Sequence, residues 1–104
     1  MSYGKLVRDK IPDIIKANGE EPITRILGSD EYKSKLENKL IEECNEVLNS
    51  SGDERIEELA DVLEILIYLA KLENKSLDDV IKSCDNKREK RGGFDNKIYL
   101  EGVK

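Results

Sequence analysis

Two long amphipathic helices are predicted by residues 29–73, which read SDEYKSKLENKLIEECNEVLNSSGDERIEELADVLEILIYLAKLE. In the first half, apolar side chains recur at steps of three and four along one helix face: Tyr32, Leu36, Leu40, Cys44, Val47 and Leu48. We expect Ser29 or Asp30 to cap this helix and Asn49–Gly52 to end it. The second helix should run from about Asp53 to Glu73. Its part VLEILIYLA is apolar on nearly all sides, so it should be the central helix or lie in a subunit interface.

Two shorter helices are predicted on either side of this pair. Residues 11–18, IPDIIKAN, have a proline near the start and Gly19 just past the end, as short helices do. Ser76 and Asp79 have the spacing of a capping box, and the helix that they open should end near Lys90, before two glycines.

The remaining segments predict a small β-ribbon. Residues 22–27 and the tail KIYLEGV, residues 97–103, both alternate apolar and polar side chains and can pair as two strands. The expected fold is therefore all-α, in a single domain of residues 1–104, with this ribbon formed by segments near the ends of the chain.

Composition restricts the function classes. The net charge is −5 and the pI is about 4.9, which argues against a nucleic-acid partner, because neutralising a phosphate backbone requires a basic face. No apolar run is long enough to span a membrane, and MSYGKLVRDK has no secretory signal pattern, so we expect a cytoplasmic protein.

Cys44 and Cys84 have no metal-type spacing and are expected to be small buried side chains. With no histidine, the chemistry must use carboxylates, amines, hydroxyls or a bound metal.

Acidic residues form the most informative pattern. Glu43 and Glu46 share a face of the first long helix, and Glu58 and Asp61 share a face of the second, because residues three apart are neighbours. The short connection predicts antiparallel packing about a centre near Ser51, which leaves each facing pair offset by about 3 Å along the helix axis. The four carboxylates are therefore expected to converge.

Converging carboxylates would repel one another unless a cation joins them. An all-oxygen set without histidine or thiolate favours Mg²⁺, or Mn²⁺, as the ligand. The alternative is that these side chains only solvate the helices, since 23 of 104 residues are acidic and such pairs arise by chance.

These motifs resemble the all-α nucleotide pyrophosphohydrolase superfamily, which includes MazG, dimeric dUTPases and phosphoribosyl-ATP pyrophosphohydrolase. The paired ExxE and ExxD motifs on consecutive helices are similar to its metal-binding motifs. KLVRDKIPDII, residues 5–15, and KREKRGGF, residues 87–94, resemble the phosphoribosyl-ATP pyrophosphohydrolase-like branch. The resemblance implies that Glu43, Glu46, Glu58 and Asp61 carry Mg²⁺, that a nucleoside triphosphate is cleaved between its α and β phosphates, and that Glu42 and Glu57 support the ligands.

Basic residues are the expected partners of the phosphates. Among Lys5, Arg8 and Lys10, Arg8 is our preferred phosphate ligand, and a second candidate set is Lys87, Lys90 and Arg91. Cations in the last turn of a helix also complement its dipole whatever the function is.

Three functions remain open at this point. The first is a Mg²⁺-dependent hydrolase of nucleoside triphosphates, which include non-canonical, house-cleaning substrates. The second is the same chemistry on phosphoribosyl-ATP in histidine biosynthesis. The third is a non-catalytic helical interaction module. Because the run Val62–Ala70 presents more apolar surface than so small a chain can cover, we expect a homo-oligomer, with a dimer as the simplest form.

Overall fold

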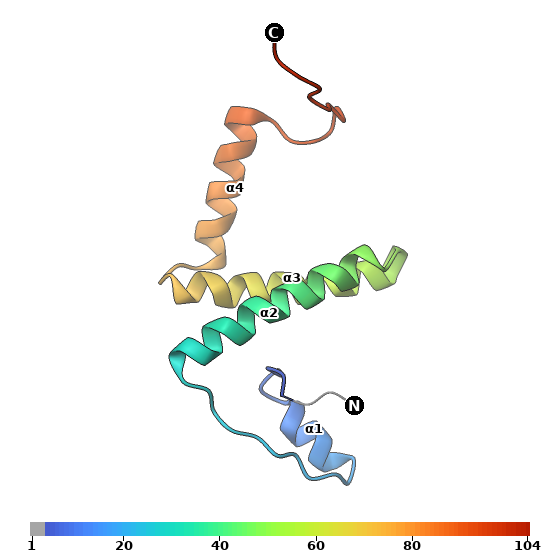
Figure 1. Ribbon diagram of the computed structural model, residues 1–104, viewed down its shortest axis with the longest axis vertical. Coiled ribbons are helices and arrows are strands. Elements are labelled where there is room, and N and C mark those ends of the chain that lie inside the picture. Colours follow the sequence, from blue (N-terminus) through green and yellow to red (C-terminus); the bar gives the residue numbers. More distant parts are fainter. Residues whose placement is uncertain (1–3) are drawn as a thin grey trace.

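The computed structural model describes residues 4–104, and this part of the chain is entirely helix and connecting segments (Figure 1). The helices are α1 (Ile11–Ala17), α2 (Ser29–Leu48), α3 (Gly52–Leu72) and α4 (Leu77–Arg91). The predicted all-α fold is confirmed. The predicted ribbon is wrong: residues 22–27 and 97–103 contain no strand, and they lie at opposite ends of the molecule in Figure 1.

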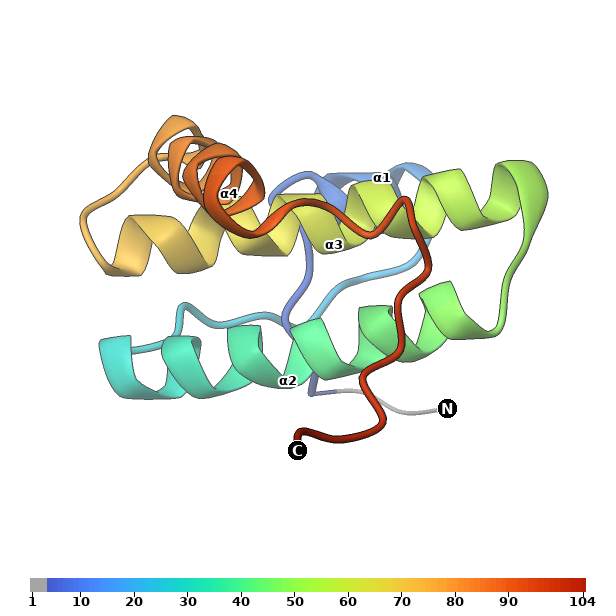
Figure 2. The same cartoon turned by 90° about the horizontal axis from the view of Figure 1, so that it is seen from above.

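An antiparallel pair formed by α2 and α3 is the centre of the fold (Figure 2). The buried apolar residues of the described part of the chain are Leu36 from α2 with Ile65 and Ala70 from α3, and they are only 5–8% exposed. At 100° per residue, Ala70 lies about 140° around α3 from Ile65, so these two residues are buried on different faces of α3. The helical periodicity thus correctly identified Leu36 as a core position.

The connection between α2 and α3 is a short turn fixed by hydrogen bonds to the backbone. The Ser50 hydroxyl donates to the Val47 carbonyl at 3.1 Å, and the Arg55 Nε donates to the Ser50 carbonyl at 2.9 Å. Gly52 has a φ of +59°, a left-handed conformation that favours glycine. This turn holds the two helices side by side and so sets which residues of the pair face each other.

The helix starts differ in how they are capped. Neither Ser29 nor Asp30 caps α2, contrary to expectation: the N-cap is Gly28, without a side-chain hydrogen bond. The capping box at α4 is confirmed, because the Asp79 N–H donates to the Ser76 Oγ at 3.3 Å and the Ser76 N–H donates to the Asp79 carboxylate at 2.8 Å. Gly92 ends α4, as predicted.

Replacement of Ser76 by alanine should lower the free energy of unfolding by about 1 kcal/mol, because the Asp79 N–H loses the Ser76 hydroxyl that accepts its hydrogen bond. Ser51→Ala is the matched control, since Ser51 is the N-cap of α3 but makes no side-chain cap hydrogen bond. Urea denaturation measures both. An equal loss in the two variants would contradict the role of the box.

The arrangement around the central pair is open. Helix α4 leads away from the end of α3 and from the helix pair in Figure 1, and the tail continues beyond it. The extents of the chain are 62 × 33 × 24 Å. None of the helices described is long and apolar enough to cross a membrane.

Candidate active site

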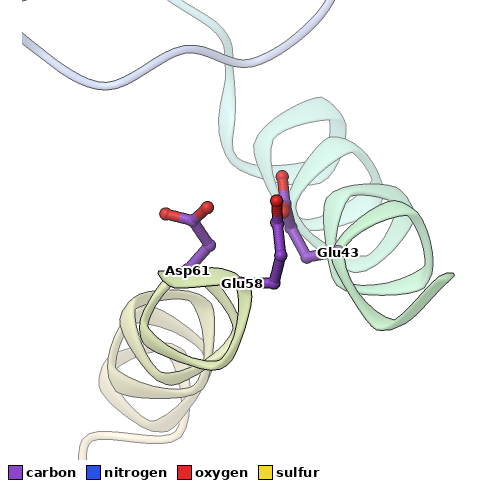
Figure 3. Close-up of side chains that lie close together, drawn as sticks. All are labelled: Glu43, Glu58 and Asp61. Carbon is purple, nitrogen blue, oxygen red and sulfur yellow. The ribbon is translucent and has the colours of Figure 1, made fainter. Parts of the chain in front are cut away.

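Three carboxylates converge on one side of the helix pair, as Figure 3 shows. Glu43 comes from α2, and Glu58 and Asp61 come from successive turns of α3. One oxygen from each lies within 4.8 Å of the others. All three residues are intermediate in exposure, so they are open to a ligand while being partly shielded from water.

Glu46, the fourth predicted ligand, is not part of this close group. It is exposed, but it lines the same open cleft of about 520 Å³ and lies near enough to affect the ionisation of Glu58. The helices therefore bring three of the four predicted carboxylates together, with Glu46 one turn further along α2.

The cleft is acidic overall but contains cations. It is lined by five carboxylates, two lysines and an amide: Glu42, Glu43, Glu46, Glu58, Asp61, Lys5, Lys39 and Asn45. The Lys39 ammonium lies 3.8 Å from Glu43 Oε1. Sequence reasoning singled out neither Lys39 nor Asn45, although the i,i+4 spacing of Lys39 and Glu43 was visible.

Arg8 reaches this cluster from the segment before α1. Its Nη2 donates to Asp61 Oδ1 at 2.8 Å, and its Nη1 lies 3.5 Å from Glu64 Oε2. The sequence analysis proposed Arg8 as a phosphate ligand, but it did not predict the ion pair between Arg8 and Asp61, which are 53 positions apart in the chain. The five carboxylates and two lysines that line the cleft give it a charge of −3, and Arg8 is shared between Asp61 and Glu64, so the site favours a cation.

The second predicted basic set lies elsewhere. Lys87, Lys90 and Arg91 are in the last turns of α4, are exposed, and do not line the cleft of their own chain. Their predicted contact with phosphate stays a prediction. Cys84, on the same helix, is exposed and accepts a 3.5 Å hydrogen bond from Arg88, and Cys44 is also exposed, so the expected burial of both cysteines within one chain is wrong.

The ionisation of Glu58 is perturbed by its surroundings. Partial desolvation raises the pKa of its carboxyl, and the negative charges of Asp61, Glu43 and Glu46 raise this pKa further. A raised carboxyl pKa is what repulsion between converging acids produces, and a bound cation would reverse it.

Binding of Mg²⁺ should therefore strengthen as the pH rises through the raised pKa of Glu58, because the proton and the metal compete for this carboxylate. The stability of the metal-free fold should change with pH in the opposite direction. The stability that the neutral Glu58 carboxyl contributes is fully present below the pKa of Glu58 in the unfolded chain, and it is lost as the pH rises through the raised pKa of the folded protein. Calorimetric Mg²⁺ titrations between about pH 4 and pH 7 test this. Glu58→Gln should flatten the dependence, and an equally steep dependence in that variant would contradict the assignment.

Comparison with known proteins gives one significant alignment, to a protein whose function is not described. Over 43 residues the chain is 49% identical to an uncharacterized protein of Mycolicibacterium smegmatis, and the alignment covers 41% of this chain and 44% of that protein. The alignment thus spans less than half the length of that relative. No protein-family profile and no solved structure matches the chain. The case for a function therefore rests on the geometry of the cleft and on the motifs of the two helices.

Proposed function

We propose that this protein is a Mg²⁺-dependent nucleotide pyrophosphohydrolase of the all-α superfamily, which cleaves a nucleoside triphosphate to a monophosphate and pyrophosphate. The observation that carries the proposal is the group of Glu43, Glu58 and Asp61, whose oxygens lie within 4.8 Å of one another at the edge of a cleft of about 520 Å³. A cleft of this size suits a nucleotide, since small-molecule sites occupy roughly 300–1,000 Å³.

The donor set fits Mg²⁺. Octahedral Mg²⁺ has ligands at about 2.1 Å, so that two of its ligand oxygens lie about 3 Å apart when adjacent and about 4 Å apart when opposite. One oxygen each of Glu43, Glu58 and Asp61 lies within 4.8 Å of the others, so small side-chain movements would bring all three to one ion. All the donors are oxygen, the ligand type that Mg²⁺ and Mn²⁺ prefer.

The cations beside the carboxylates suit the phosphates of the substrate. When bound, Mg²⁺ lowers the pKa of a coordinated water and neutralises charge on the phosphates. Lys5 and Lys39 line the cleft, and Arg8 lies at its edge with a side chain 54% exposed. Arg8 can exchange its carboxylate partner for a phosphate, because a guanidinium binds both groups through parallel hydrogen bonds.

A leaving pyrophosphate would meet positive charge from the protein as well as from the metal. The carboxylates would hold the cation, and Lys39 and Arg8, which pair with Glu43 and Asp61, would lie beside it and share the charge of the phosphates. We place this activity in the cytoplasm, where nucleotides are abundant and where the two free cysteines, Cys44 and Cys84, would stay reduced.

A substrate panel tests the proposal. Canonical, deaminated and oxidised nucleoside triphosphates, together with phosphoribosyl-ATP, are incubated with and without Mg²⁺, and pyrophosphate release is measured. We expect Mg²⁺-dependent pyrophosphate release from at least one triphosphate. Release from phosphoribosyl-ATP alone would instead assign the enzyme of histidine biosynthesis. No release from any substrate, with no binding of Mg²⁺, would identify the chain as a non-catalytic helical module.

A further inference from the structure

The segment before α1 lies beside both helices of the central pair. Its residues Gly4, Lys5 and Leu6 line a small pocket together with residues of α2, and Lys5 also lines the carboxylate cleft. The residues of α2 in this pocket are Lys35, Asn38, Lys39 and Glu42. Arg8 then reaches α3, where its side chain pairs with two acids. The segment therefore brings positive charge to the cleft from outside the helix pair.

Arg8 occupies a carboxylate that also belongs to the candidate metal group. Its Nη2 donates to Asp61 Oδ1 at 2.8 Å, and Asp61 is one of the three acids whose oxygens lie within 4.8 Å of one another. The second partner of Arg8 is Glu64, whose Oε2 lies 3.5 Å from Nη1. Glu64 neither belongs to the group of three nor lines the cleft. The guanidinium is thus shared between one acid of the metal group and one acid outside it.

A metal ion at this group would compete with Arg8 for Asp61. Mg²⁺ binds carboxylate oxygens at about 2.1 Å, so a guanidinium on the same carboxylate would lie within roughly 6 Å of the ion. Positive charges at this separation repel, and they repel more strongly where the cleft is partly shielded from water. The ion pair that must break is weak, because its side chains are 54% and 42% exposed and such pairs contribute little stability. The metal should therefore displace the guanidinium from Asp61.

The displaced guanidinium would remain beside the cleft. Glu64 is one helical turn beyond Asp61 on α3, so Arg8 can keep this second partner while its Nη2 leaves the first. The Nη2 donors are then available to another acceptor, and a phosphate suits the guanidinium as well as a carboxylate does. The phosphates of the substrate would arrive at the same metal ion that displaced Arg8. The donors that Asp61 loses therefore lie where phosphate oxygens are expected.

We propose that Arg8 couples the binding of Mg²⁺ to the binding of the triphosphate. In the metal-free protein Arg8 is the counter-cation of Asp61, and Mg²⁺ displaces it, which makes its guanidinium available to a phosphate. Arg8 therefore opposes the binding of the metal alone and favours the binding of metal and phosphate together. Because coupling between two ligands is reciprocal, the phosphate should also tighten the binding of the metal. This inference rests on the proposed function and adds to it an order of events at the cleft.

Calorimetric titration of the metal-free protein with Mg²⁺ tests the first half of this coupling. Arg8→Gln should lower the dissociation constant of Mg²⁺ by roughly two- to fivefold, because it removes a competitor held by an exposed ion pair. Lys10→Gln is the matched control, since it removes the same charge from the same segment. Lys10 is exposed, does not line the cleft and makes no ion pair with the described residues. The Mg²⁺ affinity of this control should equal that of the native protein.

Titration of the Mg²⁺-saturated protein with the magnesium complex of inorganic pyrophosphate tests the second half. Pyrophosphate reports the phosphate contact without a nucleobase. In Arg8→Gln its dissociation constant should rise by at least about tenfold, because charge-assisted hydrogen bonds to the phosphate are lost. Opposite changes in the two affinities identify the exchange of partners, since the loss of a merely structural ion pair would not strengthen one ligand and weaken the other.

The native protein reports the displacement directly through the guanidinium of Arg8. Nitrogen-15 NMR follows rotation about its Nε–Cζ bond, which hydrogen bonds to two partners slow down, and Arg8→Lys identifies the signal. Saturating Mg²⁺ should speed this rotation, and addition of pyrophosphate should slow it again. A signal that Mg²⁺ leaves unchanged would mean that Arg8 stays on Asp61, and the coupling would be wrong.

The outcomes separate this inference from the proposed function. The native protein can bind Mg²⁺ and release pyrophosphate from a triphosphate while Arg8→Gln leaves the Mg²⁺ affinity unchanged or weakens it. In that case the coupling by Arg8 is overturned and the proposed function stands. An equal gain of Mg²⁺ affinity in Lys10→Gln would also overturn the coupling, because general charge would then explain the result. If the native protein binds neither Mg²⁺ nor pyrophosphate, the coupling and the proposed function fail together.

Discussion

Asp61→Asn is expected to lower kcat/KM for triphosphate hydrolysis by at least about 100-fold, because a carboxylate that would hold Mg²⁺ against the phosphates becomes a neutral amide of nearly the same shape. Mg²⁺ should raise the melting temperature of the native protein, since a ligand that binds only the folded state stabilises it. In the variant this increment should shrink, because one oxygen of the group of three loses its charge. Steady-state kinetics and thermal melts with and without Mg²⁺ measure the two effects.

The metal-free fold should change little in this variant. Asp61 pairs with Arg8, but the two side chains are 42% and 54% exposed, and such surface pairs contribute only about 0–1 kcal/mol. Loss of repulsion with Glu58 offsets part of this. Asp53→Asn is the matched control, because Asp53 is on the same helix in its first turn and does not line the cleft. Equal Mg²⁺ responses and equal rates in the two variants would remove the proposed metal centre.

The second prediction concerns which phosphoanhydride bond of the triphosphate is cleaved. We expect a nucleoside monophosphate and pyrophosphate as the products, with no orthophosphate from the γ position. The cations beside the carboxylate group suit an intact pyrophosphate leaving group, whose charge Mg²⁺ and the chain's own Lys5, Lys39 and Arg8 can share. Phosphorus NMR of the reaction mixture distinguishes these products directly, and any triphosphate that is accepted will report them.

Hydrolysis in ¹⁸O-water then shows which phosphorus is attacked. Label in the monophosphate means attack at the α phosphorus, and label in pyrophosphate means attack at the β phosphorus. Either result agrees with the proposed products. Appearance of nucleoside diphosphate with orthophosphate would mean that the carboxylate cleft serves a different phosphohydrolase, and the proposed function would be wrong.

Local patterns account for most of the helices. The periodicity of residues 29–73 predicted α2 and α3 to within about one residue at each end, because helical boundaries there coincide with a run of Asn, Ser and Gly. The Ser76 capping box and the glycine after Arg91 predicted α4 for the same reason, since these signals act within one helical turn. The ribbon failed because alternation forms a strand only where a neighbouring strand can accept its hydrogen bonds, and the two segments lie far apart.

The sequence by itself determined that Glu58 and Asp61 share a helix face, and that Glu43 faces them across a short turn. Both follow from the fixed helical repeat and the length of one connection. Only the tertiary structure decided which acids meet: Glu46 lines the same cleft but lies outside the close group of three, and Arg8 pairs with Asp61 from a segment 53 residues earlier. The tertiary structure also decided that Lys87, Lys90 and Arg91 of α4 do not line the cleft of their own chain. Helix rotation and the direction of α4 depend on side-chain packing between distant residues, which no local repeat specifies.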